Sequence, residues 1–191
     1  MRTPSSASPI GADALAGTVR ALLRARRPSG GDLLISEHGL LVPGLGPGNP
    51  GDPVVAAIDD DENPRPILRY AAGEALRLRV PLRAVHVWIR RAPRDGARFR
   101  RHDRMSDADQ LLSQVLYDHL SAAEADAAER EILCGDTPVP ALVELSRSAG
   151  LIVLAARAPG GRGDAVGSTA GGLVGRTYCP LAVLTPAEPA G

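Results

Sequence analysis

The chain contains no lysine, and this absence removes several kinds of chemistry. All 22 of its basic residues are arginine. A chain without lysine cannot form a Schiff base through a side-chain amine, and it lacks the lysine that holds phosphate in a Walker A loop. The abundance of Arg, Ala, Gly and Pro is also typical of a GC-rich genome, so the missing lysine excludes functions without indicating one.

Aromatic residues are scarce as well, at 3% of the chain, although 44% of all residues are apolar. The hydrophobic core therefore has to consist of Ala, Val, Leu and Ile. With 191 residues, the chain is long enough for one domain of ordinary size plus additional sequence.

Cysteine, net charge and long apolar runs are also limited. Cys134 and Cys179 match no CxxC or Cys/His spacing, so neither a disulfide framework nor a zinc site is indicated. The 22 basic and 22 acidic residues cancel, which gives no general attraction to nucleic acids or membranes. No apolar run approaches the ~20 residues of a membrane span, and the first residues lack the apolar segment of a secretory signal. We expect a cytoplasmic protein that binds no membrane.

The first 51 residues differ in composition from the remainder. A Ser/Pro-rich start precedes a possible helix at residues 18–27 and a short apolar run at residues 32–36. Residues 42–53, VPGLGPGNPGDP, have the composition of a linker. We predict that residues 1–51 form a partly ordered N-terminal extension.

From residue 53 onward, apolar runs alternate with segments of helical periodicity. This alternation predicts an α/β fold, in which parallel strands are joined by right-handed crossovers and helices cover both faces of the sheet. Strands are predicted at residues 53–59, 82–89, 128–135, 151–156 and 181–185, and helices at residues 64–79, 106–123, 137–149 and 168–178.

Ligands of such open sheets bind beyond the carboxyl ends of the strands, where the strand order reverses. The ends of the first and fourth predicted strands carry Asp59 and the glycine-rich stretch AARAPGGRGDAVGST, residues 155–169. Glycines let the backbone approach a phosphate closely, and the start of a following helix favours anions. These two segments are the first candidates for a binding site.

The order of these segments over residues 53–185 resembles the universal stress protein family, most specifically in the CGDTP turn and in the GS…CPLAVL ending. The resemblance implies a Rossmann-like, open five-stranded parallel sheet in the order 3-2-1-4-5, with the domain at residues 52–186 and a tail at residues 187–191. It also implies a homodimer through the last strand, Leu181–Leu184. Many members bind ATP, with Mg or Mn where metal takes part, and a recognisable subgroup binds none.

Nucleotide-binding members carry G-x-x-G, nine residues, then G-[ST]. Gly167 and Ser168 match the end of this motif, but the two leading glycines fall on alanines and the spacer has eight residues. The resemblance further assigns Asp59 to the nucleoside and the backbone of Val87 to the adenine. The candidate ligand-binding residues are Asp59, Val87, Ala155, Ala158, Gly160, Gly161, Gly167, Ser168 and Thr169.

Three functions stay open. The first is a non-catalytic, dimeric stress-response regulator, and the second is an ATP-binding sensor with slow or no hydrolysis. The third is a nucleic-acid accessory protein that uses residues 90–104, where seven of fifteen residues are arginine; nucleic acid is the weaker expectation because acids are interspersed and only Phe99 is available for stacking. We predict no catalytic residue and assign no metal ligand, since the acidic run at residues 59–62 is more typical of a helix-capping turn than of a cation site.

Two further residues are predicted to be structural. His86 lies in a buried strand pattern with no Ser or Cys placed beside it, so we expect a packed, hydrogen-bonded histidine. Cys179 precedes a proline at a strand entrance, where we expect a small buried side chain and not a reactive thiol.

Overall fold

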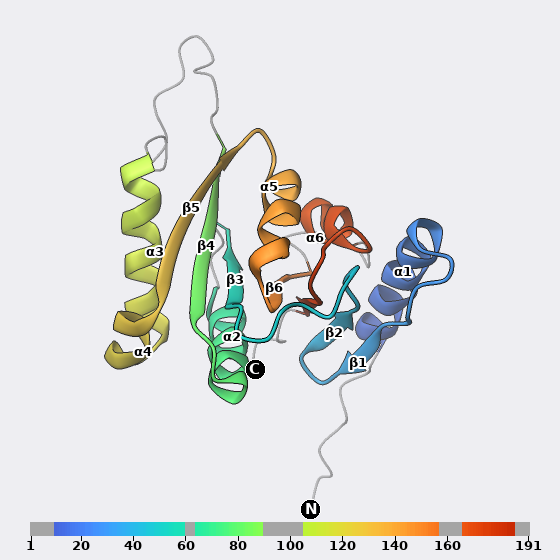
Figure 1. Cartoon of the computed structure of the whole chain (residues 1–191), viewed down its shortest axis with the longest axis horizontal. Helices are drawn as coiled ribbons and strands as arrows, with labels where there is room; N and C mark the ends of the chain where they lie inside the picture. The colour runs from blue at the N-terminus through green and yellow to red at the C-terminus, as the bar shows by residue number, and fades with distance from the viewer. Residues whose placement is uncertain (1–9, 60–63, 90–104, 157–165, 186–191) are drawn as a thin grey trace, which may run out of the picture.

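The computed structural model describes residues 10–59, 64–89, 105–156 and 166–185, in which seven strands form one mixed sheet in the order β1-β2-β7-β6-β3-β4-β5 (Figure 1). The strands are β1 (Leu34–Ser36), β2 (Gly39–Val42), β3 (Val54–Ile58), β4 (Leu82–Ile89), β5 (Glu129–Gly135), β6 (Leu151–Ala155) and β7 (Leu181–Leu184). The helices are α1 (Ile10–Arg26), α2 (Arg65–Leu78), α3 (Met105–His119), α4 (Ala122–Ala127), α5 (Pro138–Leu145) and α6 (Ser168–Leu173), with a 3-10 turn at Ser146–Ser148.

Helices cover both faces of the sheet, as the sequence predicts. Figure 1 shows α3 and α4 on one side and α1, α5 and α6 on the other. Successive residues of a strand point to opposite faces, so β3 places Val54 and Ala56 in the cluster with α2 and α3, and Val55 in the cluster with α1, α5 and α6. Strands β3, β6 and β7 are apolar throughout because both of their faces are buried.

The prediction of a five-stranded, all-parallel sheet is wrong in the number of strands and in their direction. The five predicted strands are mutually parallel and lie in the sequence β5-β4-β3-β6-β7, but β1 and β2 extend the sheet beyond β7 with antiparallel pairs. The additional strands come from the N-terminal extension, where residues 39–42 were not predicted to be extended.

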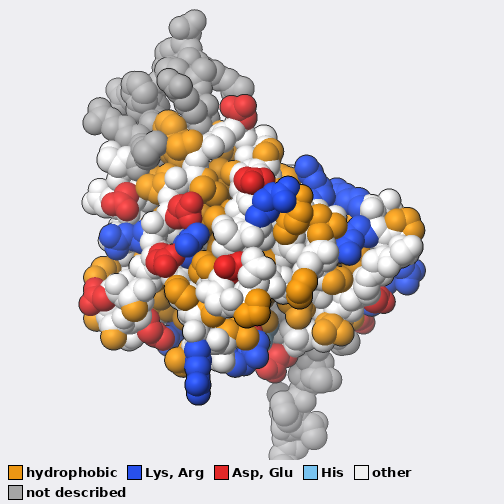
Figure 2. Space-filling model, in the orientation of Figure 1, with side chains coloured by type: hydrophobic (Ala, Val, Ile, Leu, Met, Phe, Trp, Pro, Cys, Tyr) orange, Lys and Arg blue, Asp and Glu red, His pale blue; other side chains and the backbone are white. Residues whose placement is uncertain are grey.

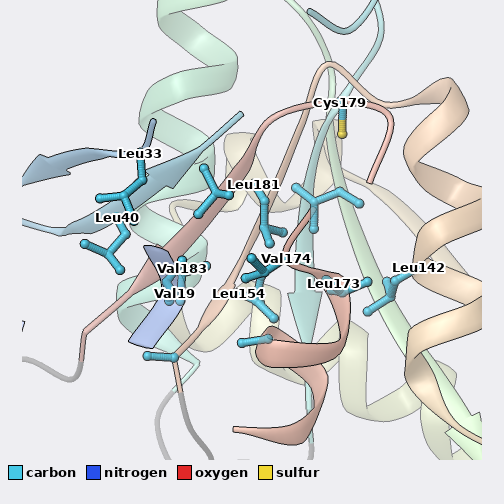
Figure 3. Close-up of a cluster of buried hydrophobic side chains, with 14 of the residues drawn as sticks. Val19, Leu33, Leu40, Leu142, Leu154, Leu173, Val174, Cys179, Leu181 and Val183 are labelled. Carbon is cyan, nitrogen blue, oxygen red and sulfur yellow. The ribbon is translucent and has the colours of Figure 1, made fainter. Parts of the chain in front are cut away.

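Residues 10–51, which we call the N-terminal arm, pack against the last strand and the last helix. Within β2, Leu40 pairs with Val183 and Leu41 pairs with Ala182. Figure 3 shows Val19, Leu33 and Leu40 of the arm next to Val183 in the same apolar cluster. In this chain Leu181–Leu184 do not form the edge of the sheet at which a second copy was expected to pair, because β2 occupies that edge. An exposed LAVL edge would present unpaired backbone groups and apolar side chains to water.

Gly39 is required where the arm meets β7. Its φ of 144° lies in a region that L side chains rarely adopt, and a Cβ at this position would lie 2.2 Å from the carbonyl oxygen of Val183. Only glycine lets the turn between β1 and β2 approach the end of β7 this closely.

An arginine of α1 ties the arm to α6. The Nη1 atom of Arg26 donates hydrogen bonds to the carbonyl oxygens of Gly171, at 2.8 Å, and Val174, at 2.5 Å. These carbonyls lie in the last turn of α6 and just beyond it, where helical carbonyls lack partners within the helix and where a positive charge is favourable.

The predicted helix at residues 106–123 is two helices. The α3 helix ends at His119, and Ser121 begins α4 with a capping box, in which its side chain accepts a hydrogen bond from the Glu124 amide while the Glu124 carboxylate accepts one from the Ser121 amide. Such a box stabilises a new helix start, so the chain turns before β5.

Candidate functional site

A hollow of about 260 Å³ lies at the carboxyl ends of β3, β4 and β6, the place where ligands of open α/β sheets bind. The β6 strand lies on one side of β3 and β4 lies on the other, so the strand order reverses here. The described residues that line the hollow are Ala57, Ile58, Asp59, Ile67, Val85, Val87, Ile89, Pro138, Leu142, Leu154, Ala155, Ala156, Gly167, Ser168, Thr169 and Ala170.

Strands β3 and β4 supply the apolar floor and one charge. Val87 and Ile89 are half-buried residues of β4, and Ile58 is buried at the end of β3. Asp59 follows directly, and it is an exposed residue that also lines the hollow. The hollow therefore combines an apolar floor with one carboxylate at its mouth.

The start of α6 supplies polar groups on the opposite side. Gly167 is the N-cap residue, and its own amide donates a 2.8 Å hydrogen bond to the carbonyl oxygen of Ala156. That bond holds the helix start next to the end of β6, but it leaves the Gly167 amide unable to serve a ligand, in contrast to the role expected from the motif. Ser168 is exposed and Thr169 is half-buried, and both line the hollow, so two hydroxyls and the first-turn amides are what α6 presents there.

His86 lies on β4 between Val85 and Val87, which line the hollow. The residue is 7% exposed, and its Nδ1 atom lies 3.0 Å from the carbonyl oxygen of Ile58 in β3. This hydrogen bond links the ends of β3 and β4, which confirms the prediction of a packed, hydrogen-bonded histidine.

Cys179 is also structural, as predicted. Its side chain is fully buried in the cluster that includes Leu181, and burial raises the pKa of its thiol to about 12. A thiol that stays protonated at neutral pH is a poor nucleophile. Cys134, by contrast, is exposed on β5.

Six of the nine predicted ligand-binding residues come together around this one hollow. These are Asp59, Val87, Ala155, Gly167, Ser168 and Thr169. The predicted residues Ala158, Gly160 and Gly161 lie outside the described residues, as do the acids at residues 60–62 and the arginine-rich segment at residues 90–104.

Sequence reasoning missed the residues that close the hollow from neighbouring helices. Ile67 of α2, and Pro138 and Leu142 of α5, line it in addition to the strand ends. Pro138 is the last residue of the CGDTP turn, which is among the most specific parts of the sequence pattern, so this position was a usable signal. No sequence signal marks Ile67 or Leu142 as a lining residue, because each occupies an ordinary core position of an amphipathic helix.

The described lining supplies little chemistry beyond binding. It contains one carboxylate and two hydroxyls, with no histidine, cysteine or arginine among its described members. Within the described residues, no three His, Cys, Asp or Glu side chains are grouped so that they could hold a metal ion. In that same part of the chain, no helix is both long and apolar enough to span a bilayer. Acidic and basic side chains are interspersed over the face shown in Figure 2, which carries no large area of one charge.

A mixed, mainly parallel α/β sheet, with helices on both faces and a hollow at the point where the strand order reverses, defines a Rossmann-like domain. The chain belongs to the universal stress protein family, because the model of that family matches residues 51–185. No curated protein matches the chain at a significant level.

Solved structures of universal stress proteins share the fold. One is the universal stress protein from Archaeoglobus fulgidus in complex with dAMP, with 24% identity, a TM-score of 0.51, and coverage of 71% of this chain and 99% of that chain. A second is a universal stress protein in complex with cAMP, with 21% identity, a TM-score of 0.51, and coverage of 70% and 95%. A third, from Burkholderia pseudomallei, has 20% identity, a TM-score of 0.51, and coverage of 74% and 100%.

Proposed function

We propose that this protein binds an adenine nucleotide in the hollow between the ends of β3, β4 and β6 and the start of α6, and that occupancy of the hollow is its regulatory event. The observation that carries the proposal is the convergence of Asp59, Val87, Ser168 and Thr169 on one hollow at the switch point. Two universal stress proteins of similar fold are complexed with dAMP and cAMP, which supports this ligand class.

The two sides of the hollow suit the two halves of a nucleotide. Val87, Ile89 and Leu142 form an apolar surface against which a planar base can pack. Asp59 lies at the mouth, where a carboxylate accepts hydrogen bonds from ribose hydroxyls. The base therefore enters first and the sugar lies at the rim.

Phosphate would then lie at the start of α6. The hydroxyls of Ser168 and Thr169 and the first-turn amides can donate hydrogen bonds to phosphate oxygens. No described lining residue is cationic, and Asp59 is the only carboxylate among them. One carboxylate is a small ligand set for a divalent cation, so Mg²⁺ or Mn²⁺ would bind together with the phosphates and not in advance of them.

We further propose that binding, and not turnover, is the functional event, with slow ATP hydrolysis as the most that the site would support. The support is the composition of the described lining, in which neither hydroxyl has a histidine beside it to act as a base. A cytoplasmic location remains part of this proposal.

The test is direct measurement of nucleotide binding. Purified protein is denatured and any released nucleotide is identified, and calorimetric titrations with AMP, ADP and ATP, each with and without Mg²⁺, then give the affinities. We expect binding of at least one of the three. Absence of binding at about 1 mM of each nucleotide would refute the proposal.

Two variants locate the ligand. Ser168→Ala removes one phosphate donor and should weaken binding about 5- to 10-fold, and Asp59→Asn should weaken it by a similar factor. Ser148→Ala is the matched control, because Ser148 is exposed and precedes β6 at the other end of that strand from Ala155. Equal affinities of the Ser168→Ala and Ser148→Ala proteins would show that the phosphates bind elsewhere.

A further inference from the structure

The two ends of the described sheet differ in how they are protected. At one end, β5 carries Glu129, Arg130 and Glu131, and its two glutamates form ion pairs with Arg83 of β4 at 2.7 and 3.2 Å. Charged residues at an edge oppose pairing with another strand. The charges of β5 therefore oppose the addition of a further strand at this edge.

At the other end, β1 is apolar on both of its faces. Leu34 is 66% exposed and Ile35 is 50% exposed, and adjacent residues of a strand point to opposite faces. Among the described residues, no strand pairs with the outer side of β1. An apolar edge strand with unpaired backbone groups is a template for another strand.

Within β1, the amide and carbonyl groups that point away from β2 are those of Ile35. Ser36 and Gly39 pair across a two-residue turn, and Leu34 pairs with Leu41. In an antiparallel ladder, residues whose amide and carbonyl face the partner strand alternate with residues whose groups face away. The closing pair of a two-residue hairpin faces inward, so Ser36 and Leu34 bond to β2 while the amide and carbonyl of Ile35 point to the open edge.

We propose that the outer edge of β1 pairs antiparallel with β1 of a second copy of this chain, around a two-fold axis at Ile35. Ile35 is the outward residue of β1, so the register that lets β1 of both copies form two reciprocal hydrogen bonds within the strand places Ile35 opposite Ile35. A shift by one residue would place the outward groups of one strand opposite inward groups of the other. The inference is independent of nucleotide binding.

The charges that flank β1 are compatible with this register. Asp32 of one copy lies opposite His38 of the other, and Leu33 lies opposite Glu37, so no like charges face each other. Asp32 is held by a 3.0 Å ion pair with Arg20, whose hydrogen bond keeps the pKa of Asp32 below its ordinary value. A strand that is self-complementary in this way fits a two-fold interface.

The position of β1 next to β2 determines where a second copy can join this end of the sheet. Because β2 already occupies the edge of β7, a second copy has to join the sheet at β1. A pairing of three-residue strands buries little surface, so we expect a weak dimer, with a Kd above about 10 μM.

Single cysteines test the register in the full chain. In a Cys134→Ser background, Ile35→Cys should form a disulfide-linked dimer under mild oxidation, because residues opposite each other in a hydrogen-bonded pair have Cα atoms about 5.5 Å apart, within the range a disulfide spans. Leu34→Cys is the matched control. Residue 34 faces residue 36 of the second copy and not itself, so Leu34→Cys alone should crosslink more slowly although the site is more exposed.

Mixing the Leu34→Cys and Ser36→Cys proteins, both in the same background, should restore rapid crosslinking. If crosslinking instead follows exposure, with Leu34→Cys as fast as Ile35→Cys, the register and the proposal are wrong.

Sedimentation velocity without crosslinking gives an independent measure. The unmodified chain should show reversible self-association between about 10 μM and about 1 mM. Ile35→Pro removes the outward amide while sparing the pairing with β2, which an edge strand tolerates, and it should abolish association. Cys134→Lys on the β5 edge should leave association unchanged. A monomer at every concentration, or a dimer lost only in Cys134→Lys, would overturn the proposal.

Discussion

Arg26→Ala should lower the free energy of unfolding by about 1–2 kcal/mol. The arginine donates hydrogen bonds of 2.8 and 2.5 Å to Gly171 and Val174 and is the described charge that caps the end of α6. Hydrogen bonds from a charged group contribute about 1.5–3 kcal/mol when buried, but Arg26 is an exposed residue, so solvent reduces each bond to about 0.5–1 kcal/mol.

Equilibrium urea unfolding, followed by circular dichroism, measures this loss. For a chain of this size the loss corresponds to a fall in melting temperature of about 2–8 °C, since about 1 kcal/mol shifts it by about 2–4 °C. Arg24→Ala is the matched control, because it removes the same charge from the same turn of α1 at an exposed position. If both variants unfold at the same urea concentration, the bonds between the arm and α6 contribute nothing measurable, and the reasoning is refuted.

Three further predictions concern the turn of the arm, the buried thiol and the α4 cap. Gly39→Ala forces a Cβ against the Val183 carbonyl and should destabilise the fold by about 2–4 kcal/mol in urea titrations, whereas a loss below about 0.5 kcal/mol would contradict the close approach. At pH 8 a thiol reagent should label Cys134 quickly and Cys179 only after unfolding; rapid labelling of both would show that Cys179 is accessible. Because the pKa of Cys179 rises from 9.0 to about 12 on folding, the stability that its protonated thiol contributes is complete below about pH 9 and is lost as the pH rises towards 12. The Cys179→Ala protein should therefore lose less of its free energy of unfolding over that pH range than the unmodified chain does. The hydrogen bond from the Ser121 hydroxyl lowers the pKa of Glu124 below 4.5, so the stability that the Glu124 carboxylate contributes is present above that pH and is lost on acidification. Glu124→Gln should narrow the difference between the urea midpoints at about pH 7 and about pH 3. An unchanged difference would exclude the cap as a source of acid sensitivity.

The sequence predicted the central sheet because its strands are buried on both faces. Residues 53–58 and 151–156 are continuous apolar runs separated by segments of helical periodicity, and the structure confirms a strand at each. The same reasoning placed Asp59 and Gly167 at the same hollow, because the carboxyl ends of neighbouring parallel strands meet at one edge of the sheet.

The arm was not predictable in the same way. Residues 39–42 form β2 because β7 offers a partner, and pairing with a strand so distant in sequence leaves no local signal. The surrounding glycines and prolines, which indicate a linker, instead allow close backbone contacts such as that of Gly39 with Val183. The helix boundary at Ser121 was missed for a different reason, since the apolar pattern of α3 continues into α4 and only the Ser-x-x-Glu cap marks the break.

The pairing of β2 with β7 also affects how the chain folds as it is synthesised. Strand β2 leaves the ribosome before its partner, Leu181–Leu184, and strands β3, β4, β5 and β6 are translated between them. Strand β2 therefore has no partner in the parallel part of the sheet until Leu181–Leu184 have been synthesised, and the apolar residues Leu33, Leu40 and Val42 lack their contacts with β7 until then. Such a long-range pairing slows folding, and it makes completion of the sheet depend on two segments that lie far apart in the sequence.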